Sequence, residues 1–211
     1  MNFLQILEKI RKNLRLLSSK IELKNSVENI IEVLKSGSNQ NKIKILETIQ
    51  NTNDLKILQE IISRLNDDSI QVRGEAFNAL LLNKNEITKI LIENLNSTNK
   101  NIKGFTSLVL ANRNEKSAIP EIKKLVDSEH GMVRSCAIGS LGYLKAENIT
   151  SIILKLLSDS NLEVQRSALY AAIQTKNFFP DQKFEEISKN SDSLIKNLLI
   201  KLKKLSGPKG I

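Results

Sequence analysis

A row of basic side chains recurs through the middle of this chain at a spacing of 30 or 31 residues. It comprises Arg73, Lys103 and Arg134, followed by Gln165 with Arg166 beside it. A half-buried guanidinium needs paired acceptors, so the row is interpreted as structural. The alternative is a basic surface that binds an anionic ligand.

The remaining reactive side chains do not form a catalytic group. His130 is the only histidine and Cys136 the only cysteine. A single histidine excludes a metal centre built from several histidines, and nothing in the sequence would orient His130 toward Cys136 as a base. The sequence contains no glycine-rich phosphate-binding motif. We therefore expect a protein without catalytic activity and without a cofactor or metal, and we expect Cys136 to be buried and inert.

The elements that carry these residues are predicted to be helices arranged in a repeat. Apolar positions recur at the same spacing as the basic row, with small or apolar residues in parallel columns. Within residues 54–83, two apolar stripes at helical spacing flank a polar turn, Asn66–Ser69, whose residues favour helix N-caps. A period of this length is typical of stacked two-helix units. One such column comprises Ile61, Leu91, Ile122 and Ile153, and another comprises Val72, Ile102, Val133 and Val164.

The stretch from Ser117 to Ser128, continued by residues 132–142, resembles a HEAT repeat of the short prokaryotic, phycobilin-lyase-like kind. The resemblance is strongest over residues 54–175 and implies an all-α, right-handed α-solenoid of about six two-helix repeats, with the second helices on a concave face. It also implies a ladder in which the basic column bonds an Asp in the turns. Ser97 replaces Asp in the unit of Lys103, which predicts a weaker rung there. The carboxylates available to the ladder are Asp67, Asp127 and Asp159.

Three regions are predicted along the chain. Residues 1–20 form an amphipathic helix that caps the array, residues 21–205 form the repeats, and residues 206–211 form a disordered tail. The alternative, contact of the N-terminal helix with an acidic membrane surface, is less favoured. No uninterrupted apolar span is long enough to cross a membrane, and a lone cysteine suits a reducing compartment. We therefore expect a cytoplasmic protein.

The net charge of +9 is concentrated at the two ends of the chain. Residues 1–20 carry five basic and one acidic side chain, residues 176–211 carry eight and four, and the repeats between them are almost neutral. A nucleic-acid-binding protein usually spreads its basic residues along the binding face. We therefore favour a scaffold that binds another protein over a nucleic-acid-binding protein or an accessory protein resembling bilin lyases or chaperones. The candidate contact residues on the second helices are Asn78, Tyr143, Arg166 and Tyr170.

Overall fold

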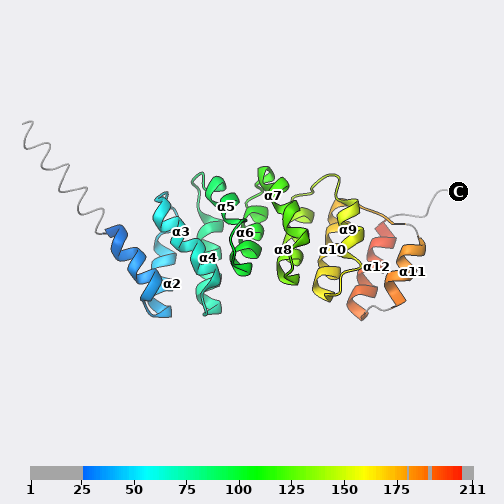
Figure 1. Cartoon of the computed structure of the whole chain (residues 1–211), viewed down its shortest axis with the longest axis horizontal. Coiled ribbons are helices and arrows are strands. Elements are labelled where there is room, and N and C mark those ends of the chain that lie inside the picture. The colour runs from blue at the N-terminus through cyan, green and yellow to red at the C-terminus, as the bar shows by residue number, and fades with distance from the viewer. Residues whose placement is uncertain (1–25, 180, 190–191, 206–211) are drawn as a thin grey trace, which may run out of the picture.

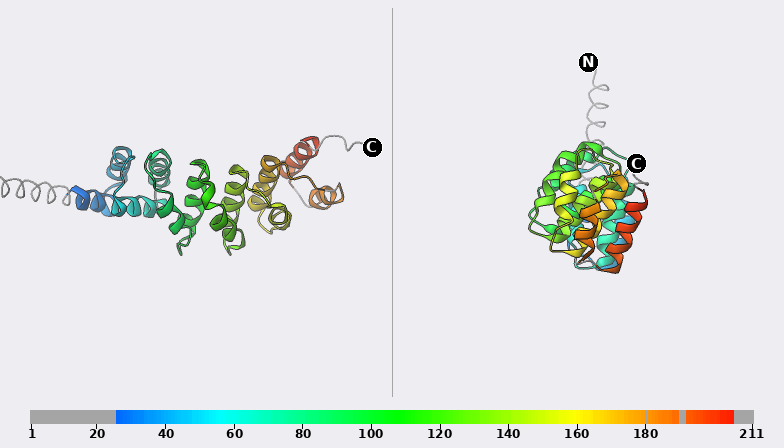
Figure 2. Two further views of the ribbon diagram at one scale, coloured as in Figure 1. Left: turned by 90° about the horizontal axis from the view of Figure 1, so that it is seen from above. Right: turned by 90° about the vertical axis from the view of Figure 1, so that its right-hand side faces the viewer.

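A computed structural model describes residues 26–179, 181–189 and 192–205 of the chain. These residues form a row of helix pairs, with α2 near one end and α11 and α12 at the other (Figure 1). The left view of Figure 2 shows the same succession of pairs from above, and the right view looks along the row from one end. No strand occurs in this part of the chain. The predicted all-α solenoid is thereby confirmed, whereas the predicted capping helix 1–20 and the tail 206–211 lie outside the described residues.

Each unit of the row contains a first and a second helix. The first helices are the helical segment 26–36, α3 (Leu55–Ser63), α5 (Thr88–Asn94), α7 (Ile119–Lys124), α9 (Thr150–Leu156) and α11 (Asp181–Lys189). The second helices are α2 (Asn39–Thr48), α4 (Ile70–Leu82), α6 (Lys100–Asn112), α8 (Gly131–Tyr143), α10 (Leu162–Thr175) and α12 (Ser193–Leu205). We number these pairs units 1 to 6. Short 3₁₀ turns lie at Arg64–Asn66, Lys116–Ala118 and Leu125–Asp127.

Polar residues in the turns start most of the second helices. The Ser69 hydroxyl accepts the N–H of Val72, and the Asn99 side chain accepts the N–H groups of Asn101 and Ile102. Asn161 caps α10 in the same way. Each contact satisfies a donor that the first turn of a helix leaves unpaired. The prediction that polar turns supply N-caps is therefore confirmed for α4, α6 and α10, whereas α8 begins after His130 without a side-chain cap.

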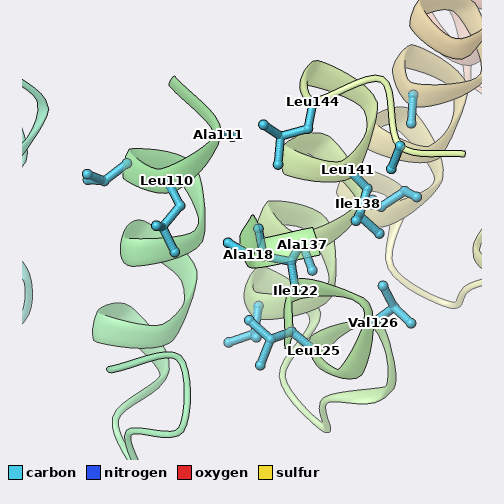
Figure 3. Close-up of a cluster of buried hydrophobic side chains, with 14 of the residues drawn as sticks. Leu110, Ala111, Ala118, Ile122, Leu125, Val126, Ala137, Ile138, Leu141 and Leu144 are labelled. Carbon is cyan, nitrogen blue, oxygen red and sulfur yellow. The ribbon is translucent and has the colours of Figure 1, made fainter. Parts of the chain in front are cut away.

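The core runs along the row between the first and second helices. The column of Ile61, Leu91, Ile122 and Ile153 is at most 1% exposed. Where units 3 and 4 meet, Leu110 of α6, Ile122 of α7 and Ile138 of α8 belong to one apolar cluster (Figure 3). No unit could bury these side chains alone, so stacking of neighbours stabilises the whole array.

The spacing between successive second helices is not uniform. A Cβ built at Gly142 of α8 would lie 2.6 Å from the Ala171 Cα of α10, and one built at Gly104 of α6 would lie 2.6 Å from the Met132 Sδ of α8. A Cβ at Gly74 of α4 would have nothing within 4 Å. Helix α8 thus packs closely on α6 at Gly104 and on α10 at Gly142, whereas α4 at Gly74 is open.

Candidate partner-binding face

A groove lies between α4 and α6 on the side of the row formed by the second helices. Its volume is about 390 Å³, and seven residues line it. Gly74 belongs to this lining, and the open space at its Cα is part of the groove. The lining residues are Ile70, Arg73, Gly74, Phe77, Asn78, Phe105 and Leu108.

Most of the surface of this groove is apolar. Ile70 is 76% exposed, although it is a large aliphatic residue at the first position of α4. Phe77 of α4 and Phe105 and Leu108 of α6 line the groove and are half-buried, and the two phenylalanines also pack against the core. Exposed apolar and aromatic groups that line a concavity are typical of binding sites, because an incoming apolar side chain would cover them.

The two polar side chains that line the groove differ in how firmly hydrogen bonds hold them. The Arg73 guanidinium donates to the carbonyl oxygens of Asp67 at 2.6 Å and Asp68 at 3.2 Å, which fixes it on the turn before α4. The Asn78 side chain is exposed, and its amide donates to Glu75 over 3.5 Å. Asn78 therefore presents an amide that could bond the backbone of a partner, as expected for a contact residue.

The other candidate contact residues lie outside this groove. Tyr143, at the end of α8, is 51% exposed, and Tyr170, on α10, is 47% exposed. Arg166 bonds Glu163 on its own helix and Asp192 before α12, and the Asp192 carboxylate raises the pKa of this guanidinium further. Arg166 thus joins unit 5 to unit 6. The structure brings Asn78 into the groove and leaves the two tyrosines exposed on neighbouring helices.

Two rungs of the basic ladder link successive units through carboxylates. Arg134 donates Nε and Nη2 to the two oxygens of Asp159 at 2.7 and 2.8 Å, and its Nη1 bonds the carbonyl oxygens of Ser128 and Glu129. This hydrogen bond from Arg134 is the main reason that the pKa of Asp159 lies below its usual value. Lys42 donates to Asp67 at 2.8 Å in the equivalent place between units 1 and 2. Lys42 lies 31 residues before Arg73, so the repeat spacing could have revealed it.

The electrostatics of Asp67 reflect two opposing effects. Burial alone would raise the pKa of this carboxyl. The hydrogen bonds from Lys42 and from the Ser69 N–H, together with the charge of Arg64, outweigh burial and hold the pKa below its usual range. Asp67 is thus kept ionised as an anchor for the turn and for unit 1.

The predicted ladder differs from the structure at three positions. Arg73 bonds the carbonyl oxygen of Asp67 and not its carboxylate, because Lys42 and Arg64 occupy the carboxylate. Asp127 pairs with Lys155 on the exposed surface. Lys103 makes no side-chain hydrogen bond or ion pair within the described ranges.

The residues in the turns explain why some carboxylate rungs of the ladder are missing. Asp67 and Asp159 lie two residues after Leu65 and Leu157, and the equivalent residues after Leu95 and Val126 are Ser97 and Ser128. Unit 2 with unit 3, and unit 3 with unit 4, therefore have no carboxylate at the position where units 1 and 2 and units 4 and 5 form their rungs.

The described residues contain no candidate metal site. They contain no group of three or more His, Cys, Asp or Glu side chains that could hold a metal ion. Burial raises the pKa of the Cys136 thiol to about 11, so the reactive thiolate is scarce at neutral pH. His130 is exposed and lies 3.5 Å from Glu129. No helix in the described part is both long and apolar enough to span a membrane.

Comparison with known proteins agrees with the repeat architecture. Residues 88–174 match the family model of HEAT repeats. A search of curated proteins gives no match. The finer resemblance to the phycobilin-lyase-like kind stays a prediction.

Solved structures of engineered and designed proteins share the fold. One engineered protein is 16% identical with a TM-score of 0.53, covering 86% of this chain and 98% of that chain. A second engineered protein is 17% identical with a TM-score of 0.50, covering 86% and 96%. A designed armadillo repeat protein is 16% identical with a TM-score of 0.50, covering 84% and 98%. At these identities the likeness shows the fold alone.

Proposed function

We propose that this chain, whose residues 88–174 match the family model of HEAT repeats, is a non-catalytic scaffold that binds a partner protein on the face formed by α4, α6, α8 and α10. The groove between α4 and α6 is the main anchor on this face. The observation that carries the proposal is the apolar lining around the open position at Gly74, formed by the exposed Ile70 and the half-buried Phe77, Phe105 and Leu108. An array of this kind is typical of protein-interaction scaffolds.

The charges of this face support a protein partner over a nucleic acid. Arg134 and Arg166 are engaged by carboxylates and Arg73 by backbone carbonyls. On α4, α6, α8 and α10, this leaves Lys100 and Lys103 as the cations without a hydrogen bond or ion pair in the described residues. Nucleic-acid affinity depends on neutralising several phosphates at once, which two lysines cannot do. Apolar side chains beside exposed amides suit a polypeptide better.

A selection with random peptides tests this function. The folded chain would be used to select from a displayed library of peptides about 12 residues long, enough to span the groove as an extended segment. The enriched peptides would be synthesised with a fluorescent label and titrated by fluorescence anisotropy. We expect them to carry a large apolar residue, because the groove offers aromatic and aliphatic surface.

The matched variants are Gly74→Leu and Gly139→Leu. A Cβ at either position meets nothing within 4 Å, so both variants should fold, but Gly74 lines the groove and Gly139 lies on α8. Filling the groove removes the burial of one apolar anchor, worth about 1.5–3 kcal/mol, so Gly74→Leu should weaken binding roughly 10- to 100-fold. Gly139→Leu should bind as the unchanged protein does. The proposal fails if no peptide is enriched or if Gly74→Leu binds with unchanged affinity.

A further inference from the structure

A second and larger groove lies between α11 and α12, at the end of the row opposite α2 (Figure 1). Its volume is about 580 Å³. The lining consists of Phe184, Glu185, Ser188, Lys189, Lys196, Leu199, Ile200 and Lys203. None of these residues belongs to the face proposed above, so this groove requires a separate explanation.

The apolar part of the groove is recessed. Phe184 is 7% exposed and Leu199 is 4% exposed, and the ring of Phe184 packs against Phe179 with centroids 6.0 Å apart. Ile200 is 53% exposed and forms an apolar wall. A recessed floor beside a projecting wall receives a ridge of side chains, whereas a flat lipid surface would leave the floor uncovered. The shape therefore favours a protein element over a membrane.

The rim of the groove is mainly positive. Lys189 of α11 and Lys196 and Lys203 of α12 line it, and Glu185 is the acidic residue in the lining. Lys196 and Lys203 lie one heptad apart, so they share one side of α12. In the described residues, the side chains of Lys189 and Lys196 have no hydrogen bond or ion pair. Such a rim attracts and orients an acidic partner.

The place of the groove in the row indicates the form of this partner. Each of α4, α6, α8 and α10 has another second helix on both sides, as α8 has α6 and α10. Helix α12 packs against α10 and α11, and the described residues place no further helix on it. A helix of α12's 13 residues is about 20 Å long, so a partner helix of similar length could lie along it.

We propose that the groove between α11 and α12 is a second docking site, and that it binds an acidic amphipathic helix of a partner protein. The apolar ridge of that helix packs on Phe184, Leu199 and Ile200, and its carboxylates face Lys189, Lys196 and Lys203. Helix-in-groove recognition requires this combination of an apolar floor and charged edges. The site is independent of the groove between α4 and α6, and it would hold even if the scaffold function proposed above were wrong.

Two model peptides test the site on the full chain. The first has about 16 residues, enough for a helix of four turns, with Leu on one face and Glu on the others. The second carries Lys in place of every Glu. Both would be labelled and titrated by fluorescence anisotropy at about 50 mM and 500 mM NaCl, because screening separates charge effects from apolar contacts. We expect the acidic peptide to bind at low salt, to bind more weakly at high salt, and to bind at least about tenfold more tightly than the basic peptide.

Variants locate the binding on the protein. Lys196→Glu and Ile200→Asp change exposed side chains of the groove, so circular dichroism should show an unchanged fold. Each should weaken the acidic peptide about tenfold, the first by charge repulsion and the second by loss of an apolar contact. The control is Lys56→Glu, at an exposed lysine of α3 far along the row, and it should change affinity less than about twofold. Gly74→Leu should also leave this binding unchanged, which separates the site from the other groove.

Four outcomes would overturn the proposal. These are failure of the acidic peptide to bind at low salt, equal binding of the basic peptide, unchanged binding by Lys196→Glu, and an equal loss in Lys56→Glu. Two further results would assign the groove to another occupant and would equally overturn it. The first is self-association of the chain that Lys196→Glu abolishes, measured by sedimentation. The second is binding to vesicles containing phosphatidylserine in the absence of acidic-peptide binding.

Discussion

Alanine should change the free energy of unfolding differently at three glycines of the second helices. Gly74 of α4 and Gly139 of α8 have open space where a Cβ would lie. At Gly142, one turn beyond Gly139 on the same helix, a Cβ would lie 2.6 Å from the Ala171 Cα and 2.8 Å from its Cβ. Nothing about the residue type distinguishes these positions, so a difference in stability would report the packing of α8 on α10.

The expected magnitudes follow from two effects. Alanine in a helix interior is favoured over glycine by about 1 kcal/mol. Gly74→Ala and Gly139→Ala should therefore raise the free energy of unfolding by roughly 0.5–1 kcal/mol. At Gly142 the same gain is opposed by overpacking, which costs about 1–3 kcal/mol, and here the obstacle includes the backbone of α10. Gly142→Ala should thus be neutral to about 2 kcal/mol destabilising, and always less stable than Gly139→Ala.

Urea denaturation followed by circular dichroism at helical wavelengths measures all three variants against the unchanged chain. The comparison between Gly139→Ala and Gly142→Ala is the critical one, because both lie on α8 and differ only in their neighbours on α10. If Gly142→Ala were as stable as Gly139→Ala, the close approach of α8 and α10 at Gly142 would be refuted. Destabilisation by Gly74→Ala would contradict the open space on α4 and, with it, the shape of the proposed groove.

The remaining predictions concern the ladder and the half-buried thiol of Cys136. Asp159→Asn should lower the free energy of unfolding at pH 7 by about 1–3 kcal/mol, because it leaves the Arg134 guanidinium without its two charged acceptors. Since the folded protein holds the pKa of Asp159 below its usual value of 3.8, this contribution is complete above about pH 5 and is lost as the pH falls below about 4. Urea midpoints of both proteins should therefore converge in acid, and a constant difference at all pH values would contradict the ion pair. Because the pKa of Cys136 is about 11, Ellman's reagent at pH 8 should label this thiol far more slowly than the thiol of the urea-unfolded chain, and equal rates would show that it is accessible.

Repeat spacing predicts the core well because stacked units demand the same residue type at the same depth. The column of Ile61, Leu91, Ile122 and Ile153 is buried throughout, as its spacing indicates. The prediction weakens in unit 1, at one end of the array. A step of 31 residues back from the buried Ala76 of unit 2 leads to Ile45 in unit 1. However, Leu46 is the fully buried residue there, and Ile45 is only half-buried. An end unit packs on one neighbour only, so its helix can rotate without breaking a column on both sides.

The groove between α4 and α6 could not be read from the sequence, because it depends on what lies across from each glycine. Gly74 and Gly104 occupy equivalent positions, 30 residues apart. A Cβ at Gly104 would meet Met132 and Cys136 of α8, whereas one at Gly74 would meet nothing. The difference arises in three dimensions from the distance between neighbouring second helices. The repeat pattern selected Asn78 as a candidate contact residue, but it could not show that a groove lies beside it.

The ladder and the groove together indicate where the array is least constrained by its own contacts. Carboxylate rungs join units 1 and 2 through Lys42, units 4 and 5 through Arg134, and units 5 and 6 through Arg166. Between units 2 and 3, the corresponding turn carries Ser97 in place of an aspartate.

In this interval Arg113 donates to the carbonyl oxygens of Leu80, Asn83 and Asn85, and the amide of Asn101 bonds Asn66. These acceptors are neutral, and they leave the exposed side of α4 around Gly74 uncovered. In the proposed complex, a partner that inserts an apolar side chain there displaces no ion pair of the ladder, which is a cost that opposes binding at the three interfaces with carboxylate rungs. Units 3 and 4 also lack a rung, because Ser128 stands in their turn, but there Met132 and Cys136 occupy the space beside Gly104. Among the described glycines, only at Gly74 does the missing rung coincide with open space, which supports the proposed groove.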